Sequence, residues 1–224
     1  MKTRISAARA RRLTEAHHLH VAGSSLAKAS KVALLIHGRH ASGEVILPLA
    51  DRLSMPGLCF LAPDAETGSW YPGLFMAPIA ANEPYLSQSL ERLGAILRAV
   101  EELGFSVNDE IALVGFSQGA CLVLEYAARN PRRYAGILGF TGGLIGPDPM
   151  PRQESGTFDG TPVFLGCSEK DPFIPAKRVL ETAEHLKARG AIVTTRFYPG
   201  SDHIINDDQI THGLEILSSS KVVA

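Results

Sequence analysis

The sequence predicts an α/β protein with a mostly parallel central sheet and helices on both faces. Short, continuous apolar runs alternate along the chain with segments of helical periodicity. Most of the apolar runs lack polar alternation, which is typical of strands that are covered on both faces. Strands and helices that alternate through a whole chain favour a parallel sheet between two helical layers.

Six apolar runs are the predicted strands, at residues 32–36, 58–62, 111–114, 136–140, 162–165 and 191–197. The clearest predicted helix carries an apolar stripe from Leu86 to Val100 at spacings of three and four, and Gly104 follows it as a stop signal. Three further helices are expected: one from Ser117 to Asn130, one from Pro175 to Gly190, and one over 206–217.

The length of 224 residues suits one domain, which we expect over 13–224. Residues 1–12 are basic and lack acidic side chains, so they are predicted to form a disordered tail, with a targeting segment as the alternative. The stretches 65–83 and 141–161 are the sizeable connections between elements. We therefore expect little or no cap domain and a shallow, open site.

Charge and cysteine content narrow the class of protein. The chain has 22 Lys and Arg against 23 Asp and Glu, a net charge of −1, which disfavours a nucleic-acid partner. No apolar run approaches the roughly 20 residues of a membrane helix. The three cysteines, an odd number, lie scattered in apolar stretches and predict neither a disulfide framework nor a zinc site. A reducing, cytoplasmic location is the simplest interpretation.

The strongest chemical signal is the pentapeptide Gly115-Phe-Ser-Gln-Gly119. It follows a predicted strand and opens a predicted helix, which is the context of a nucleophile elbow. Such a sharp turn crowds its neighbours, and glycines two residues before and after Ser117 remove the Cβ atoms that would collide. The helix N-terminus favours a developing negative charge. We therefore predict that Ser117 is a nucleophile.

A serine nucleophile needs a histidine base, which lies downstream in α/β-hydrolases. Three histidines follow Ser117. His185 and His212 fall inside predicted helices, whereas His203 lies in a loop directly after a strand, at the carboxyl end of the sheet. We expect His203 to be the base, with a surface loop histidine as the alternative.

The base needs a carboxylate that orients it. Asp171 follows the strand at 162–165 and precedes a proline-bounded loop, so it is the predicted acid. Glu169 lies two residues earlier, and Asp202 adjoins His203. Neighbours in a turn rarely present their side chains to each other, which disfavours Asp202.

Two backbone amides are expected to form an oxyanion hole. The first is that of Gln118, directly after the nucleophile, and the second is that of Arg39 in the early loop His37-Gly38-Arg39. The Arg39 guanidinium could bind a substrate carboxylate, but an exposed or structural role is the more common one.

Apolar side chains in loops at this end of the sheet could line an acyl pocket, or they could pack on the rim to cover the core. These candidates are Trp70, Tyr71, Leu74, Phe75, Leu144 and Phe173. His17, His18 and His20 suggest a metal cluster, but they lack partners at a diagnostic spacing, so no metal site is predicted.

The chain resembles the phospholipase/carboxylesterase branch of the α/β-hydrolases, relatives of acyl-protein thioesterases, from about residue 33 to the last helix. The resemblance rests on six motifs, which are Leu35-Ile-His-Gly-Arg39, Ser69-Trp-Tyr-Pro72, Gly115-Phe-Ser-Gln-Gly-Ala120, Thr141-Gly-Gly-Leu-Ile-Gly-Pro147, Asp171-Pro-Phe-Ile-Pro175 and His203. The chain departs from this family at His40, where the family usually has glycine.

The resemblance implies an α/β-hydrolase fold and metal-independent hydrolysis of carboxylic esters or thioesters through an acyl-enzyme. The expected partners are a small ester substrate and water, without a cofactor, in a monomer or homodimer. One alternative is a dienelactone-hydrolase-like lactonase, although resemblance to that family would imply a cysteine nucleophile. A non-catalytic module that binds a small ligand is another, because a fold does not guarantee activity.

Overall fold

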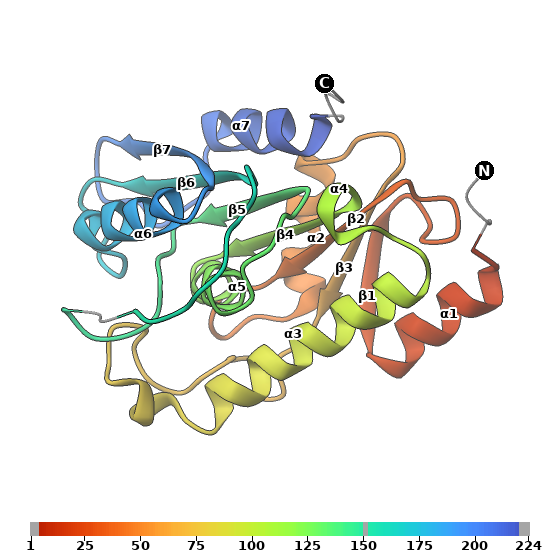
Figure 1. The fold of residues 1–224 in the computed structure, drawn as a ribbon, viewed down its shortest axis with the longest axis horizontal. Helices are drawn as coiled ribbons and strands as arrows, with labels where there is room; N and C mark the ends of the chain where they lie inside the picture. The colour runs from red at the N-terminus through yellow and green to blue at the C-terminus, as the bar shows by residue number, and fades with distance from the viewer. Residues whose placement is uncertain (1–4, 150–151, 220–224) are drawn as a thin grey trace.

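The computed structural model describes residues 5–149 and 152–219. It contains a seven-stranded sheet in the order β1-β3-β2-β4-β5-β6-β7 (Figure 1). Strand β1 runs antiparallel to β3, and every other neighbouring pair is parallel. The predicted, mostly parallel sheet is therefore confirmed.

The strands are β1 (Leu19–Gly23), β2 (Lys31–Ile36), β3 (Leu58–Pro63), β4 (Ile111–Phe116), β5 (Gly136–Phe140), β6 (Pro162–Ser168) and β7 (Ile192–Tyr198). The helices are α1 (Ala7–Ala16), α2 (Gly43–Arg52), η1 (Ile79–Asn82), α3 (Tyr85–Glu102), α4 (Val107–Glu110), α5 (Gln118–Arg129), α6 (Ala176–Ala188) and α7 (Asp207–Ser218). All six predicted strands and all four predicted helices are present, within a few residues of the expected bounds.

Two separate hydrophobic cores cover the two faces of the sheet. Helices α1, α3, α5 and α6 pack on one face, where the larger core contains residues from Ala10 to Ala191. Helices α2 and α7 cover the other face around Phe60 and Phe164. Strands β2 to β6 are buried almost throughout, which explains their continuous apolar runs. The edge strand β7 alternates between exposed and half-buried residues instead.

The prediction of a disordered tail over residues 1–12 is wrong for the part that the structure describes. Residues 7–16 form α1, which Ser6 caps by accepting a hydrogen bond from the Arg9 amide. Ala10 and Leu13 are buried in the larger core. The basic side chains that suggested disorder occupy the opposite, exposed face of this short amphipathic helix. Residues 1–4 lie outside the described part of the chain.

The loops at the carboxyl ends of the parallel strands carry little regular structure. Between β3 and α3 the one regular turn is the four-residue η1, and the described residues between β5 and β6 form no helix. The expectation of little or no cap domain is met. None of the described helices combines the length and the apolar character that crossing a bilayer requires.

The packing of α1 can be tested by substituting Leu13. Replacing this buried leucine with alanine removes core contacts and should lower the free energy of unfolding by about 2–4 kcal/mol. The neighbouring Arg12 is exposed, so Arg12→Ala should change it by less than about 0.5 kcal/mol. Urea unfolding followed by circular dichroism measures both. Equal stability of the two variants would show that α1 contributes nothing to the core.

Candidate active site

Ser117 occupies a strained turn between β4 and α5. Its backbone has φ 55° and ψ −120°, a conformation that L-residues rarely adopt. A Cβ atom at Gly119 would lie 2.2 Å from the carbonyl oxygen of Ile36, and one at Gly115 would lie 2.4 Å from that of Gly119. Both glycines are therefore required by the tight crossing of helix and strand, as the motif predicts. This geometry holds the Ser117 side chain at the carboxyl end of the sheet.

The structure brings Ser117, His203 and Asp171 into one hydrogen-bonded chain. His203 Nε2 lies 2.8 Å from Ser117 Oγ, and His203 Nδ1 lies 2.8 Å from Asp171 Oδ2. Three loops, after β4, β6 and β7, supply these groups. A carboxylate on Nδ1 keeps the proton on that nitrogen and leaves Nε2 free to accept the serine proton.

Both oxygens of the Asp171 carboxylate accept hydrogen bonds. Its Oδ1 accepts hydrogen bonds from the amides of Phe173 and Ile174, at 2.8 and 2.9 Å, while Oδ2 faces His203. The side chain is fully buried. The competing residues Glu169 and Asp202 are exposed and belong to no such chain.

Ser168 and Gln209 hold the loop that contains His203, and the sequence analysis did not predict either of them. The Ser168 hydroxyl donates to the carbonyl of Asp202 at 2.6 Å, and the buried Gln209 side chain donates to that of Ile204. Phe173 packs its edge against the imidazole ring, 5.0 Å between centroids. No motif marks such contacts, since they join side chains to the backbone of a distant loop. The rival histidines, His185 on α6 and His212 on α7, lie outside this chain of groups.

The early loop after β2 lies against the nucleophile. A Cβ atom at Gly38 would come within 3.4 Å of Ser117 Cβ. His37 is buried, and because its Nε2 accepts a hydrogen bond from the Ala65 amide, its proton lies on Nδ1 and is donated to the Gly38 carbonyl. Burial lowers the pKa of His37 and favours this neutral form. The neutral His37 ring thus holds the backbone of the early loop in place.

His40 adopts the conformation for which glycine is best suited. Its φ is 58°, in the left-handed region. The loop therefore keeps a glycine-type path in spite of the side chain, at a cost of roughly 1 kcal/mol of backbone strain. The His40 side chain is exposed and lines the mouth of the adjoining cavity.

A cavity of about 650 Å³ opens beside Ser117. It is lined mainly by apolar side chains, with Tyr71, Phe75 and Cys121 at its buried end and Val45, Leu74 and Phe173 exposed at its mouth. The loop after β3 forms one of its walls, so the cavity has an enclosed end as well as the open mouth that we expected. Of the predicted pocket residues, Tyr71, Leu74, Phe75 and Phe173 line it.

The prediction that Trp70 and Leu144 line the pocket is wrong. The Trp70 side chain is buried and does not line the cavity; its Nε1 donates to the His37 carbonyl at 2.9 Å and its ring packs against the His37 imidazole. Leu144 is buried in the larger core. Both side chains support the site without reaching the cavity.

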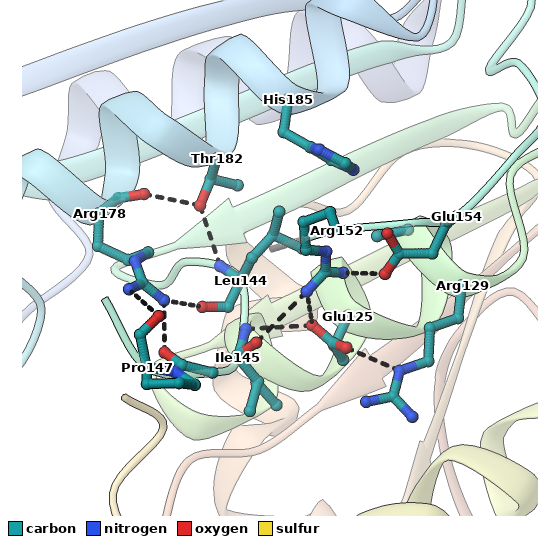
Figure 2. Close-up of polar contacts among 12 residues, drawn as sticks. Glu125, Arg129, Leu144, Ile145, Pro147, Arg152, Glu154, Arg178, Thr182 and His185 are labelled. Carbon is teal, nitrogen blue, oxygen red and sulfur yellow. Dashed lines mark hydrogen bonds and ion pairs between the residues drawn. The ribbon is translucent and has the colours of Figure 1, made fainter. Parts of the chain in front are cut away.

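Figure 2 shows the polar contacts that hold the backbone at Leu144. Its amide donates to Thr182 Oγ1 and its carbonyl accepts from Arg178, both on α6. The next amide, that of Ile145, donates to the buried carboxylate of Glu125 on α5, which also receives Arg152. Buried charged groups thus fasten this loop to two helices, a role that a sequence motif does not reveal.

The side chains of Arg39 and Gln118 are engaged with the loop after β3. The Arg39 guanidinium donates to the carbonyls of Pro72 and Gly73, so it serves a structural contact and not a free anion site. Gln118 Oε1 accepts from the Trp70 amide, and its Nε2 donates to the Tyr71 carbonyl.

The remaining cysteine and histidine side chains do not form a second reactive or metal-binding site in the described part of the chain. Burial raises the pKa of the Cys121 thiol to about 12, which disfavours the thiolate that a cysteine nucleophile requires. His20 pairs with Asp64 at 3.0 Å. Within the described ranges 5–149 and 152–219, no group of three or more His, Cys, Asp or Glu side chains could hold a metal ion.

Several known proteins are similar to this chain. A crystal structure of a phospholipase/carboxylesterase from Dyadobacter fermentans is 38% identical, has a TM-score of 0.85, and matches over 89% of this chain and 96% of its own. Acyl-protein thioesterase 1 of Gibberella zeae is 33% identical over 43% of this chain and 42% of its own length. A putative carboxymethylenebutenolidase of Aquifex aeolicus is 24% identical over 70% and 68%. The chain thus spans about half of the length of the thioesterases that it matches.

The model of one family, described as phospholipase/carboxylesterase, matches residues 23–220. That span runs from the end of β1 past the end of α7 and contains the elbow, the His203 loop and Asp171. The departure at His40 leaves the backbone path of the early loop intact. This chain belongs to the phospholipase/carboxylesterase family of α/β-hydrolases.

Proposed function

We propose that the protein is a serine hydrolase that cleaves carboxylic esters, and thioesters, of neutral short-to-medium acyl groups through an acyl-enzyme. The observation that carries the proposal is the chain of two 2.8 Å hydrogen bonds from Asp171 through His203 to Ser117. Family membership supports the same reaction class.

The three side chains divide the work of acyl transfer. Ser117 Oγ attacks the carbonyl carbon of the ester while its proton passes to His203 Nε2. Asp171 holds the imidazole in place and stabilises the imidazolium that forms. The tetrahedral intermediate collapses, and the alcohol or thiol leaves with the proton from Nε2. Water then attacks the acyl-enzyme by the same steps and releases the acid.

Two backbone amides, those of Gln118 and Arg39, stabilise the negatively charged oxygen of the tetrahedral intermediate by donating hydrogen bonds to it. Gln118 is the first residue of α5, so the N-terminal end of the helix adds a favourable field. Among the described residues, neither amide donates a hydrogen bond to another protein group. Both residues line the cavity next to Ser117. These features support an oxyanion hole that is already formed.

The cavity supports a neutral acyl substrate. Arg39 is the one Lys or Arg among its described lining residues, and its guanidinium already serves two backbone carbonyls. A volume of about 650 Å³ with mostly apolar walls suits a hydrocarbon chain.

A specific relative favours a second candidate, a lactonase, because the chain is 24% identical to a putative carboxymethylenebutenolidase. Two features weigh against it: the nucleophile position holds Ser117, and the nearby Cys121 is buried with a raised pKa. A non-catalytic binding module would not need Ser117, His203 and Asp171 to be hydrogen-bonded to one another.

A cytoplasmic location is part of the proposal. It is supported by the three cysteines, which are free and buried.

The proposal is tested with Ser117→Ala and a short p-nitrophenyl ester. Loss of the nucleophile should lower kcat by about 10⁴-fold or more, because the remaining groups cannot form an acyl-enzyme. Ser54→Ala is the matched control, since Ser54 is exposed at the end of α2, and it should keep wild-type turnover. A fluorophosphonate probe should label wild type and the control but not Ser117→Ala. If Ser117→Ala kept most of its activity, the serine mechanism would be wrong.

The two aspartates beside His203 provide a second test. Asp171→Asn should lower kcat on the order of 10³- to 10⁴-fold, because an amide no longer holds the imidazole proton on Nδ1. Asp202→Asn changes an exposed neighbour of the same histidine and should alter turnover by less than about twofold. Steady-state kinetics on one ester compares them. A larger loss in Asp202→Asn than in Asp171→Asn would reverse the assignment of the acid.

A further inference from the structure

Residues 70–75, here called the strap, form one wall of the cavity. The strap lies between β3 and α3 and has no helical or strand structure. Three of its side chains, those of Tyr71, Leu74 and Phe75, line the cavity. A loop of this kind would ordinarily be mobile, so its position needs a physical cause.

Hydrogen bonds from other parts of the protein hold the carbonyl groups of the strap. Each of its six carbonyls accepts a hydrogen bond: Trp70 from Ser89, Tyr71 from Gln118, Pro72 and Gly73 from Arg39, Leu74 from Asn82, and Phe75 from the Gly146 amide. Ser89 lies on α3, Gln118 on α5 and Asn82 in η1. A segment with this many fixed peptide groups keeps its side chains in one place.

Asn82 holds the strap from outside the lining of the cavity. Its side chain is completely buried, with Oδ1 accepting from the Gly73 amide at 2.7 Å and Nδ2 donating to the Leu74 carbonyl at 2.9 Å. A Cβ atom at Gly73 would come within 2.8 Å of Asn82 Oδ1, so the two residues are in close contact. Asn82 does not line the cavity. It can therefore influence a substrate through the strap alone.

The strap borders the part of the cavity that suits the acyl chain. Tyr71 and Phe75 are buried at its inner end, whereas Leu74 is 75% exposed at the mouth. In the proposed reaction the alcohol departs first, and the acyl group stays attached to Ser117 until water arrives. The enclosed end is thus the place for the group that stays, and the open mouth is the exit for the group that leaves.

We propose that Asn82 is a positioning residue that sets the acyl-chain selectivity of the enzyme by holding the strap at Gly73 and Leu74. The inference rests on the proposed esterase function. An acetyl group reaches only Ser117 and the two amides next to it. A longer chain also contacts the strap, and each methylene buried against a fixed apolar wall favours the transition state by roughly fourfold.

The test compares Asn82→Ala with wild type on p-nitrophenyl acetate and hexanoate. The ratio of kcat/KM for hexanoate to that for acetate should fall about tenfold, as though contact with about two methylenes were lost. This ratio does not depend on how much of the enzyme is folded, since both esters report on the same folded fraction. Asn108→Ala, an exposed asparagine on α4, is the matched control and should keep the wild-type ratio.

Two results would overturn the inference. Rates on both esters that fall by the same factor in Asn82→Ala would mean that Asn82 serves stability alone. A ratio that changes along a series of acetate esters with longer alcohols, and not along the acyl series, would mean that the strap contacts the leaving group.

If Asn82→Ala does not fold, Gly73→Ala disturbs the same contact from the side of the strap, because its Cβ atom would lie 2.8 Å from Asn82 Oδ1. An unchanged acyl ratio in that variant would equally overturn the inference. Failure of the proposed function is recognised separately, because wild type itself would then show no ester hydrolysis that depends on Ser117.

Discussion

The crossing of β2 and α5 is the constraint on which the rest of the site depends. The helix passes so close to the strand that only glycine fits at position 119, where a Cβ atom would lie 2.2 Å from the Ile36 carbonyl. Directly before this helix, Ser117 adopts a strained backbone conformation with a positive φ, and its Oγ lies 2.8 Å from His203 Nε2. The packing of the sheet and its two hydrophobic cores stabilises this strained conformation. The His203 and Asp171 loops then have one fixed point to meet, and the loop after β2 lies close against the nucleophile.

The loops around Ser117 are held in place by buried polar groups that are hydrogen-bonded, and not by a cap domain. His37 stays neutral under the early loop, Asp171 is fixed by two amides, and the strap has every carbonyl bonded. Such networks rigidify a site because each unmade hydrogen bond in a low-dielectric interior is costly. Loops without regular structure can thereby supply a precise wall. The outer lining of the cavity, at Val45, Leu74 and Phe173, remains open to solvent.

The sequence predicted six of the seven strands, the four long helices α3, α5, α6 and α7, and the three groups that the structure brings together, but it did not predict the edge strand β1 or helix α2. Each predicted feature had a local signal: continuous apolar runs, helical stripes, or a glycine-flanked serine at a strand-to-helix junction. What could not be predicted depends on contacts between distant segments. Helix α1 looked like a basic tail because only Ala10 and Leu13 meet the core. Trp70 and Leu144 looked like pocket residues because position at the right end of the sheet does not determine whether a side chain points in or out. Asn82, Ser168 and Gln209 carry no motif at all.

The central claim, that Ser117 forms a covalent acyl-enzyme, is tested most directly by trapping that intermediate. The protein is mixed with p-nitrophenyl acetate, quenched in acid within the first turnover, digested and examined by mass spectrometry. The account predicts one acetyl group on the peptide that contains Ser117, and on no other peptide. An enzyme that hydrolyses the ester without acetylation of Ser117, or with the acetyl group on Cys121, would contradict it.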